Sequence, residues 1–409
     1  MPAPRLRFPG FEGEWEEKKL GEYLTESRLV GSDGAKARKI TVKLWGKGVY
    51  EKQDRIQGSE NTKYFKRKAG QLIYSKLDFL NGAFGLIPPE LDGLESTLDL
   101  PCFDFSKDLH PNYILEYISR EEFYSKFEGG ALGGRKARRV TPEEFLNTSV
   151  PLPSLPEQAR IAAALSSLDA VIAAHQSRQD ALREHKRGLL AGLFPAEGEQ
   201  VPRLRFPEFE GAGEWEEKKL GEVAEVVRGG SPRPIDAYMT TASDGLNWLK
   251  IGDVDKEAKY ISGTREKVIK SALNRTRQIH SGDLILSNSM SFGRPYISEI
   301  SACIHDGWIA ITNINDSTLS EFLYYYISSE SSQSYFFSKA AGSGVKNLNA
   351  DLIKALPVSI PSLPEQTRIA AALSSLDDLI TAQGDKIAAL LEFKQGLLRG
   401  LFPAVGNEE

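Results

Sequence analysis

One long segment occurs twice in this chain, and that repeat constrains the fold more than any other feature of the sequence. Residues 153–195 match residues 361–403 at 29 of 43 positions, and both copies begin PSLPEQ and end GLFP. The stretches that precede the two copies, residues 23–151 and 223–360, share little sequence. The chain therefore consists of two halves, each with a divergent body followed by a shared segment.

A second repeat, which we call the lead segment, precedes each body. The sequence PRLRFPGFEGEWEEKKLGE at residues 4–22 returns at residues 202–222 with a two-residue insertion. Shared parts indicate a common scaffold or a common partner, whereas divergent bodies indicate two different targets.

Each copy of the first repeat predicts a long helix. Ser154 and Glu157 have the spacing of a capping box, as do Ser362 and Glu365 in the second copy, and a proline ends each copy. Apolar residues alternate at spacings of four and three over about five heptads, which favours a coiled coil. A surface helix on a globular domain is the alternative, but a helix of about 60 Å exceeds a small domain. The expected seam contains Ile161, Leu165, Leu168, Ile172, Leu182, Leu189, Leu193, Ile369, Leu373, Leu376, Ile380, Ile387, Leu390, Leu397 and Leu401.

The connectivity predicts that the two helices run antiparallel, because the first leads away from the first body and the second starts at the second body. The expected fold class is mixed α/β (α+β), with two globular domains separated by the antiparallel coiled coil in a pseudo-twofold tandem repeat. In a centred register Gln179 faces Gln383 as a buried polar pair. Both chain ends are expected beside the first body.

The expected domain organisation follows from the repeats. The first body with its lead segment spans residues 1–152, and the first helix with a linker spans residues 153–199. The second body with its lead segment spans residues 200–360, and the second helix with a tail spans residues 361–409.

Composition points to a cytoplasmic protein. Cys102 and Cys303 are too few for a disulfide framework or a four-ligand zinc site and are expected to be buried thiols. The N-terminus lacks the apolar core of a signal peptide, and no apolar run has the length of a membrane span.

Motifs for catalysis are absent from the sequence. It contains no G-x-x-x-x-G-K-[ST] loop, no G-x-G-x-x-G and no H-x-x-x-H spacing. Asp253, Glu257 and Lys259 loosely resemble the D…E-x-K pattern of nucleases. The two carboxylates are too close in sequence for the usual two-strand arrangement, and a solvated turn explains these residues better. We expect no catalytic residue, no metal and no cofactor in this chain.

Basic segments within the two bodies point to an anionic partner. The net charge of the chain is −5, yet residues 31–68 carry 11 Lys or Arg against 4 Asp or Glu, and residues 259–294 carry 7 against 2. Lys and Arg bind phosphates, while forked and amide side chains read base edges. A solvated surface is the alternative for any single residue, but a basic run in each half favours DNA.

The candidate DNA-binding residues divide between the bodies. In the first body they are Lys36, Arg38, Lys39, Lys43, Lys47, Lys63, Tyr64, Lys66, Arg67, Arg135, Lys136 and Arg138. In the second body they are Arg228, Ser231, Arg233, Lys270, Arg275, Arg277, Asn288, Arg294, Lys346 and Asn347.

With these motifs the chain resembles the specificity (S) subunit of type I restriction-modification systems. The resemblance rests on PLPSLPEQARIAAALSSLD, its second copy, and the endings of the type L-x-x-x-K-x-G-L-L-x-G-L-F-P. It extends to the bodies through SP at 231–232, WLKIGD at 248–253, GDLILS at 282–287, GR at 293–294, KYF at 63–65, GQLIYSK at 70–76, GAFG at 82–85, LDG at 91–93 and RRVTPEE at 138–144. One departure is Gln71, where the family often has Asp, as the second body has Asp283; no functional consequence is expected.

The resemblance implies a function without catalysis by this chain. Each body would be a target-recognition domain that reads one half of a bipartite, asymmetric site in double-stranded DNA. The helices would set the spacer, and two methyltransferase (M) subunits would bind the shared segments. Restriction (R) subunits could join, and S-adenosylmethionine, ATP and Mg would be held by these partners.

Three alternatives remain at this point. The chain could be the specificity partner of a related enzyme in which cleavage and methylation are fused. It could be a nuclease, or an adaptor that bridges two proteins. No membrane partner is expected.

Overall fold

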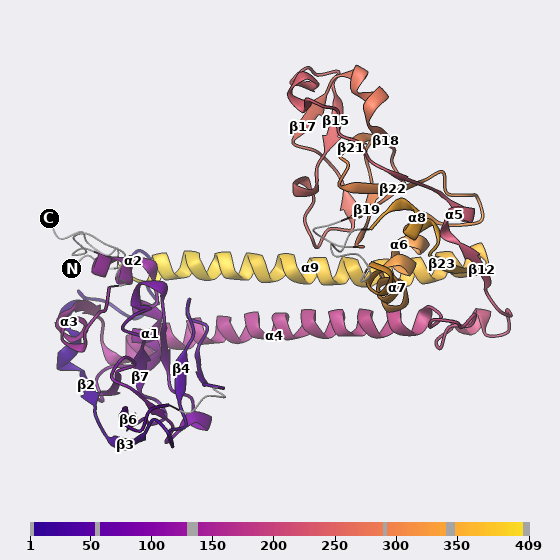
Figure 1. The fold of residues 1–409 in the computed structure, drawn as a ribbon. Coiled ribbons are helices and arrows are strands. Elements are labelled where there is room, and N and C mark those ends of the chain that lie inside the picture. Colours follow the sequence, from indigo (N-terminus) through magenta and orange to yellow (C-terminus); the bar gives the residue numbers. More distant parts are fainter. Residues whose placement is uncertain (1–3, 54–57, 129–137, 289–292, 341–347, 404–409) are drawn as a thin grey trace. The chain divides into compact units, whose positions relative to one another are not determined.

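The computed structural model describes residues 4–53, 58–128, 138–288, 293–340 and 348–403. The chain divides into two units (Figure 1): unit 1 comprises Met1–Gln176 and Asp385–Glu409, and unit 2 comprises Ser177–Gly384. Each unit contains one divergent body, its lead segment and about half of each long helix. The fold is mixed α/β, as predicted.

The two repeated segments form the two longest helices. Helix α4 (Leu155–Leu193) and helix α9 (Leu363–Leu401) each have 39 residues. Each helix ends two residues before the proline that the sequence marked as its end. Within the described residues, no helix combines the length and the apolar character needed to cross a membrane.

Unit 1 is built from short antiparallel strands and small helices (Figure 1). One four-stranded sheet has the order β2-β10-β7-β8, a three-stranded sheet has the order β3-β6-β9, and β4 pairs with β5. The strands are β1 (Glu16–Lys19), β2 (Leu24–Ser27), β3 (Val30–Asp33), β4 (Ile40–Val42), β5 (Val49–Glu51), β6 (Lys63–Lys66), β7 (Leu72–Tyr74), β8 (Phe84–Leu86), β9 (Glu95–Ser96), β10 (Cys102–Phe105) and β11 (Ser149–Leu152). The helices are α1 (Pro111–Ile118), α2 (Glu121–Tyr124) and α3 (Pro142–Asn147).

Unit 2 contains two five-stranded sheets, with the orders β13-β22-β19-β20-β16 and β14-β17-β15-β21-β18. The strands are β12 (Glu216–Lys219), β13 (Glu225–Arg228), β14 (Met239–Thr240), β15 (Leu246–Leu249), β16 (Tyr260–Ile261), β17 (Glu266–Val268), β18 (Arg277–Ile279), β19 (Leu284–Ser287), β20 (Pro295–Ser298), β21 (Ala302–Ile304), β22 (Trp308–Thr312) and β23 (Pro357–Ile360). The helices are α5 (Leu220–Val223), α6 (Ser320–Ser328), α7 (Glu330–Ala340) and α8 (Ala350–Lys354).

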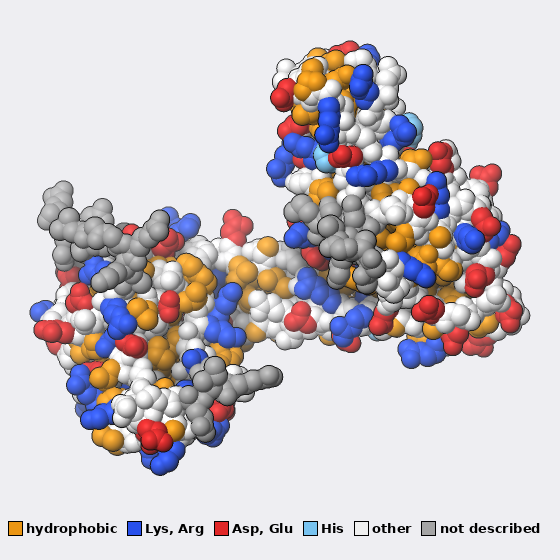
Figure 2. All heavy atoms as spheres, viewed as in Figure 1, with side chains coloured by type: hydrophobic (Ala, Val, Ile, Leu, Met, Phe, Trp, Pro, Cys, Tyr) orange, Lys and Arg blue, Asp and Glu red, His pale blue; other side chains and the backbone are white. Residues whose placement is uncertain are grey.

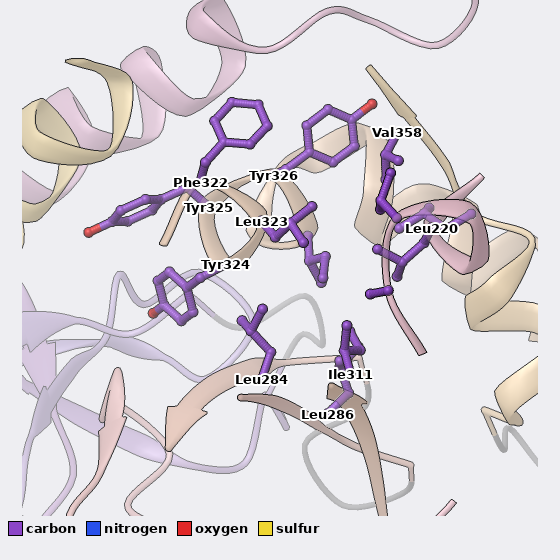
Figure 3. Close-up of a cluster of buried hydrophobic side chains, with 14 of the residues drawn as sticks. Leu220, Leu284, Leu286, Ile311, Phe322, Leu323, Tyr324, Tyr325, Tyr326 and Val358 are labelled. Carbon is purple, nitrogen blue, oxygen red and sulfur yellow. The ribbon is translucent and has the colours of Figure 1, made fainter. Parts of the chain in front are cut away.

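The core of unit 2 lies between α6 and the first of these sheets (Figure 3). Phe322 and Leu323 of α6 are fully buried, and Leu286 of β19 and Ile311 of β22 lie in the same cluster. The aliphatic side chains of the two strands point toward the helix in the close-up. Burial of this apolar surface fixes α6 on the sheet.

The duplication is visible in the strand pairs that close each body. Strand β1 of the first lead segment pairs antiparallel with β11, which places Glu16 opposite Leu152. Strand β12 of the second lead segment pairs with β23 in the same register, which places Glu216 opposite Ile360. In each unit the lead segment thus forms a ribbon with the strand that leads into the long helix.

An ion pair ties each lead segment to the start of a long helix. In unit 1, Arg7 donates to both carboxylate oxygens of Glu157 at 2.8 Å, and in unit 2 Arg205 donates to those of Glu365 at 2.7 and 2.8 Å. The capping-box role predicted for these glutamates is therefore corrected. A carboxylate that is only 2% exposed is better satisfied by a bidentate guanidinium.

The two long helices are antiparallel within each unit. In unit 1, Leu401 at the end of α9 shares a core with Ile161 near the start of α4. In unit 2, Leu193 at the end of α4 shares a core with Ile369 near the start of α9. All predicted seam residues are buried or half-buried.

Polar residues lie within the seam as the centred register predicts. The Gln179 amide donates to the carbonyl oxygen of Ile380 at 3.1 Å, and Gln383, one turn further along α9, is only 8% exposed. The described residues near the two chain ends lie within unit 1, where the Leu6 amide donates to the carbonyl oxygen of Gly400 at 2.8 Å.

Gln71 and Asp283 have the same local role despite their different chemistry. The side chain of Gln71 accepts a hydrogen bond from the Lys68 amide at 2.9 Å, and the Asp283 carboxylate accepts one from the His280 amide at 2.7 Å. An amide oxygen thus replaces a carboxylate oxygen in the turn before β7.

Candidate nucleic-acid interface

Basic side chains of unit 1 gather around the three-stranded sheet. Lys63 and Lys66 are exposed on β6, with the half-buried Tyr64 between them. Lys66, Lys36 and Arg38 line a hollow of about 480 Å³ whose wall also contains Glu95. The Glu95 carboxylate accepts hydrogen bonds from the amide and hydroxyl of Ser32 at 2.8 and 2.9 Å, so these bonds offset part of its charge.

Several of the predicted cations form surface ion pairs. Arg38 makes two hydrogen bonds to Glu51 at 3.0 and 2.9 Å, and Lys36 lies 3.8 Å from Asp33. Exposed pairs of this kind contribute little to stability because solvent screens them, so an incoming phosphate can replace the carboxylate at little cost. Lys39 is half-buried and belongs to the same segment.

Arg67 is a correction to the predicted site. It is 1% exposed, and its guanidinium donates to the Ser96 hydroxyl at 2.8 Å and to the Ser27 carbonyl at 2.7 Å, with further carbonyl contacts. Burial lowers the pKa of this guanidinium, and nearby charges oppose the effect. Arg67 joins strands inside unit 1 and presents nothing to DNA in this structure.

Other residues of the first body lie apart from the hollow or outside the described chain. Arg138 is half-buried and pairs with Glu144 at 3.2 Å. Lys43 and Lys47 are exposed in the loop between β4 and β5. Arg135 and Lys136 lie outside the described residues.

Unit 2 has its own polar hollow, of about 480 Å³, lined by Ser231, Arg233, Trp248 and Asp306 among others. The Ser231 hydroxyl donates to the Asp306 carboxylate at 3.0 Å, and Arg228 donates to the Asp306 carbonyl at 3.0 Å. Arg233 is 85% exposed with its guanidinium 4.0 Å from Asp306. The predicted Ser231 and Arg233 thus line one hollow, and Arg228 is bonded to Asp306 in its wall.

A second basic group of unit 2 follows β17. Lys270 pairs with Asp244 at 3.0 Å, Arg275 and Arg277 are exposed, and Arg294 pairs with Glu257 at 3.4 Å. Figure 2 shows acidic and basic side chains mixed over the visible face of unit 2 rather than one unbroken basic strip.

Asn288 is the second correction. It is 4% exposed, and its amide donates to the Asp306 carbonyl at 3.1 Å while its main chain bonds to Gly307 and Leu348. A side chain whose donors are used inside the fold cannot read a base edge without rearrangement. Lys346 and Asn347 lie outside the described residues.

The loose nuclease pattern does not form a shared site. Asp253 accepts a hydrogen bond from the Lys250 amide, and Glu257 pairs with Arg294. The Lys259 ammonium instead donates to the Tyr325 hydroxyl and to Ser374, both at 3.1 Å.

The comparisons with known proteins point to one class. Residues 212–392 match the family model described as the type I restriction modification DNA specificity domain. The MjaVIII type I restriction enzyme specificity subunit of Methanocaldococcus jannaschii is 23% identical over 381 residues, which are 90% of this chain and 87% of that protein. The MjaIX specificity subunit of the same organism is 27% identical over 171 residues, 41% of this chain and 39% of that protein.

Solved structures agree on the fold. A chain from a study of complex assembly and conformational transition of the type I R-M system matches with a TM-score of 0.59 and 20% identity, over 98% of this chain and 100% of that one. The type I restriction-modification S subunit from M. genitalium matches with a TM-score of 0.57 and 15% identity, over 98% and 99%.

One exposed aromatic residue is not among the candidates predicted from the sequence. Trp45, in the loop between β4 and β5, is 60% exposed. Its signal was present as the sequence KLWGKG, a tryptophan between lysines and glycines. Lys250 and His305 also line the hollow of unit 2; Lys250 lies within the sequence WLKIGD, whereas no sequence motif marks His305.

Proposed function

Because this chain belongs to the family of type I restriction-modification specificity subunits, we propose that it reads a bipartite, asymmetric DNA target. Each divergent body is proposed to be a target-recognition domain for one half-site, within the domain boundaries 1–152 and 200–360. The chain acts in the cytoplasm and leaves the chemistry to methyltransferase subunits, two per chain, and to restriction subunits. S-adenosylmethionine, ATP and Mg belong to those partners.

The observation that carries this proposal is the contrast between repeated scaffold and divergent bodies. The ion pairs Arg7–Glu157 and Arg205–Glu365 are equivalent to within 0.1 Å, as are the main-chain hydrogen bonds Leu6–Gly400 and Leu204–Gly192 at 2.8 and 2.7 Å. The basic residues of the bodies have no such equivalence. A scaffold that occurs twice and carries two different bodies fits a protein that recognises two different half-sites.

The two helices are proposed to set the distance between the half-sites. A helix of 39 residues is about 58 Å long. Length added or removed in both helices then changes the unread spacer and leaves both half-sites unchanged.

Repeated apolar positions support two equivalent sites for methyltransferase subunits. Leu155 of α4 and its counterpart Leu363 of α9 are 39% and 40% exposed. Val171 and its counterpart Leu379 are 43% and 50% exposed. Exposed apolar side chains that recur at matched positions fit a partner that binds twice.

The test is an exchange of one body. Residues 23–151 are replaced by the corresponding body of another specificity subunit, and the targets are selected from a random DNA pool in the presence of the methyltransferase subunits. One half-site is expected to change while the other half-site and the spacer stay the same. A change in both half-sites, or no selection by either protein, would refute the proposal.

A further inference from the structure

Trp45 is the exception among the tryptophans of this chain. Trp15, Trp215, Trp248 and Trp308 are each 1–2% exposed, whereas Trp45 is 60% exposed. A large aromatic surface left in water costs free energy unless a partner covers it.

The loop that carries Trp45 is firmly anchored in unit 1. Strands β4 and β5 pair antiparallel, with Val42 opposite Val49. Both valines are buried in a core cluster with Ile40 and Ile73. The base of the hairpin is therefore part of the folded body.

The tip of the hairpin is also held in place. The Trp45 amide donates to the Asn81 carbonyl at 2.8 Å, and the Gly46 amide donates to the Gly82 carbonyl at 2.9 Å. Trp45 has a φ of 60°, in the left-handed region that glycine tolerates far better than a tryptophan. The fold thus keeps a tryptophan at a strained position and points its indole away from the core.

The surroundings of the indole are positively charged. Lys43 and Lys47 flank it and are exposed, and the Lys43 ammonium lies 4.3 Å from the centre of the Tyr50 ring. Among the described residues, no carboxylate pairs with Lys43 or Lys47. The segment 38–52 carries five Lys or Arg and one Glu, a local charge of +4.

We propose that the β4–β5 hairpin of unit 1 enters a groove of duplex DNA, where Trp45 packs against bases and Lys43 and Lys47 contact phosphates. This inference rests on the proposed function and adds the element and the residue that contact bases. A two-stranded ribbon fits the major groove, and an aromatic side chain gains contact with thymine methyls and base edges there. The positive charge of the segment 38–52 favours DNA over a protein as the partner that covers Trp45.

Two substitutions separate side-chain loss from misfolding. Trp45→Gly removes the indole and suits a φ of 60°, so the melting temperature is expected to be equal to or above that of the wild type. Leu98→Ala, at a residue of unit 1 that is 42% exposed, is the matched control for the loss of a surface apolar group.

The probe is a duplex selected from a random pool by the full wild-type chain with its methyltransferase subunits. Trp45→Gly is expected to weaken binding to this duplex roughly tenfold to a hundredfold, with the slope of log affinity against log salt unchanged. Lys47→Ala is expected to reduce that slope by about 1. Leu98→Ala should bind like the wild type.

Fluorescence supplies an independent readout. Addition of the selected duplex is expected to quench the tryptophan emission of the full chain, and Trp45→Phe should abolish most of that quenching because the other tryptophans are buried.

Binding by Trp45→Gly and DNA-induced quenching in Trp45→Phe that match the wild type would overturn this inference while leaving the proposed function intact. The inference would also be overturned if the methyltransferase subunits alone quenched the tryptophan emission and DNA then caused no further change. In that case a protein, and not DNA, would cover the indole. Failure of the wild-type complex to select any sequence would instead refute the proposed function.

Discussion

The ammonium of Lys394 in α9 lies 2.8 Å from both carboxylate oxygens of Asp169 in α4, within unit 1. The same ammonium lies 3.2 Å from Glu116 of α1. Unit 2 has the counterpart in Lys186 of α4, which lies 2.5 Å from Asp377 of α9. The lysine of the repeated L-x-x-x-K motif is thus a cross-link between the helices in both units.

Removal of Lys394 should destabilise unit 1. Burial raises the pKa of Glu116, and Lys394 counters that effect, so Lys394→Met leaves two neighbouring carboxylates without a cation. We expect the unfolding free energy to fall by about 1 to 3 kcal/mol at pH 7, measured by urea denaturation of the full chain. The loss should shrink at pH 4, where Glu116 is protonated.

Lys186→Met is the matched control for that experiment. Asp377 retains the Tyr325 hydroxyl, which donates to it at 2.7 Å, so its carboxylate is not left without a donor. A smaller loss is expected in unit 2. Equal losses in both variants would show that Glu116 plays no part.

The lead segment of unit 1 should be released when its ion pair is broken. Glu157 is 2% exposed, and Arg7 binds both of its oxygens, so Arg7→Ala leaves a buried carboxylate unpaired. A loss of about 2 kcal/mol corresponds to roughly 30-fold faster hydrogen exchange at the Leu6 amide. Arg5→Ala, at an exposed neighbour, is the control; unchanged protection of Leu6 in Arg7→Ala would contradict the prediction.

Regular elements of this fold could be predicted because their signals are local. The sequence WIAIT at residues 308–312 is rich in aromatic and β-branched residues, which is typical of a strand, and it forms β22 (Trp308–Thr312). The segment at residues 319–327 has the apolar character of a short buried helix and forms α6 (Ser320–Ser328). The spacing of apolar residues and the duplicated segments indicate the type and position of these elements, and neither signal depends on a long-range contact.

The candidate site could be predicted only in part, because burial depends on partners far away in the sequence. Lys66 and Arg67 are adjacent basic residues, yet the first is exposed and the second is buried by acceptors that include Ser27 and Ser96. Asn288 is similarly buried by Asp306. Trp45 was missed for the opposite reason, since an aromatic residue is normally expected in the core.

The carboxyl group of Asp283 should make unit 2 less stable as the pH rises above about 4. Burial raises the pKa of Asp283 above its ordinary 3.8, with the His280 amide and ring opposing this shift. The folded state therefore binds the proton more tightly than the unfolded state, and the unfolding free energy falls between pH 3.8 and the folded-state pKa.

Asp283→Asn tests this pH dependence. The amide oxygen of asparagine can still accept the hydrogen bond of the His280 amide, as Gln71 accepts that of Lys68 in unit 1. Compared with the wild type, the variant should gain stability as the pH rises above 3.8, seen as a rising difference between the two urea midpoints. A difference that does not change with pH would rule out this role of Asp283.

Substitution of the adjacent basic residues Lys66 and Arg67 should have two unlike effects. Arg67→Ala removes the donor to the Ser27 carbonyl oxygen and the buried side chain itself, and should lower the unfolding free energy by about 3 kcal/mol. Lys66→Ala should change stability by less than about 0.5 kcal/mol but reduce the salt slope of DNA binding by about 1, because one phosphate contact is lost. Lys107→Ala, at an exposed residue outside the basic segment, should change neither quantity. A normal salt slope in Lys66→Ala would remove β6 from the proposed DNA-binding surface, and a stable Arg67→Ala protein would show that the buried guanidinium is dispensable for the fold.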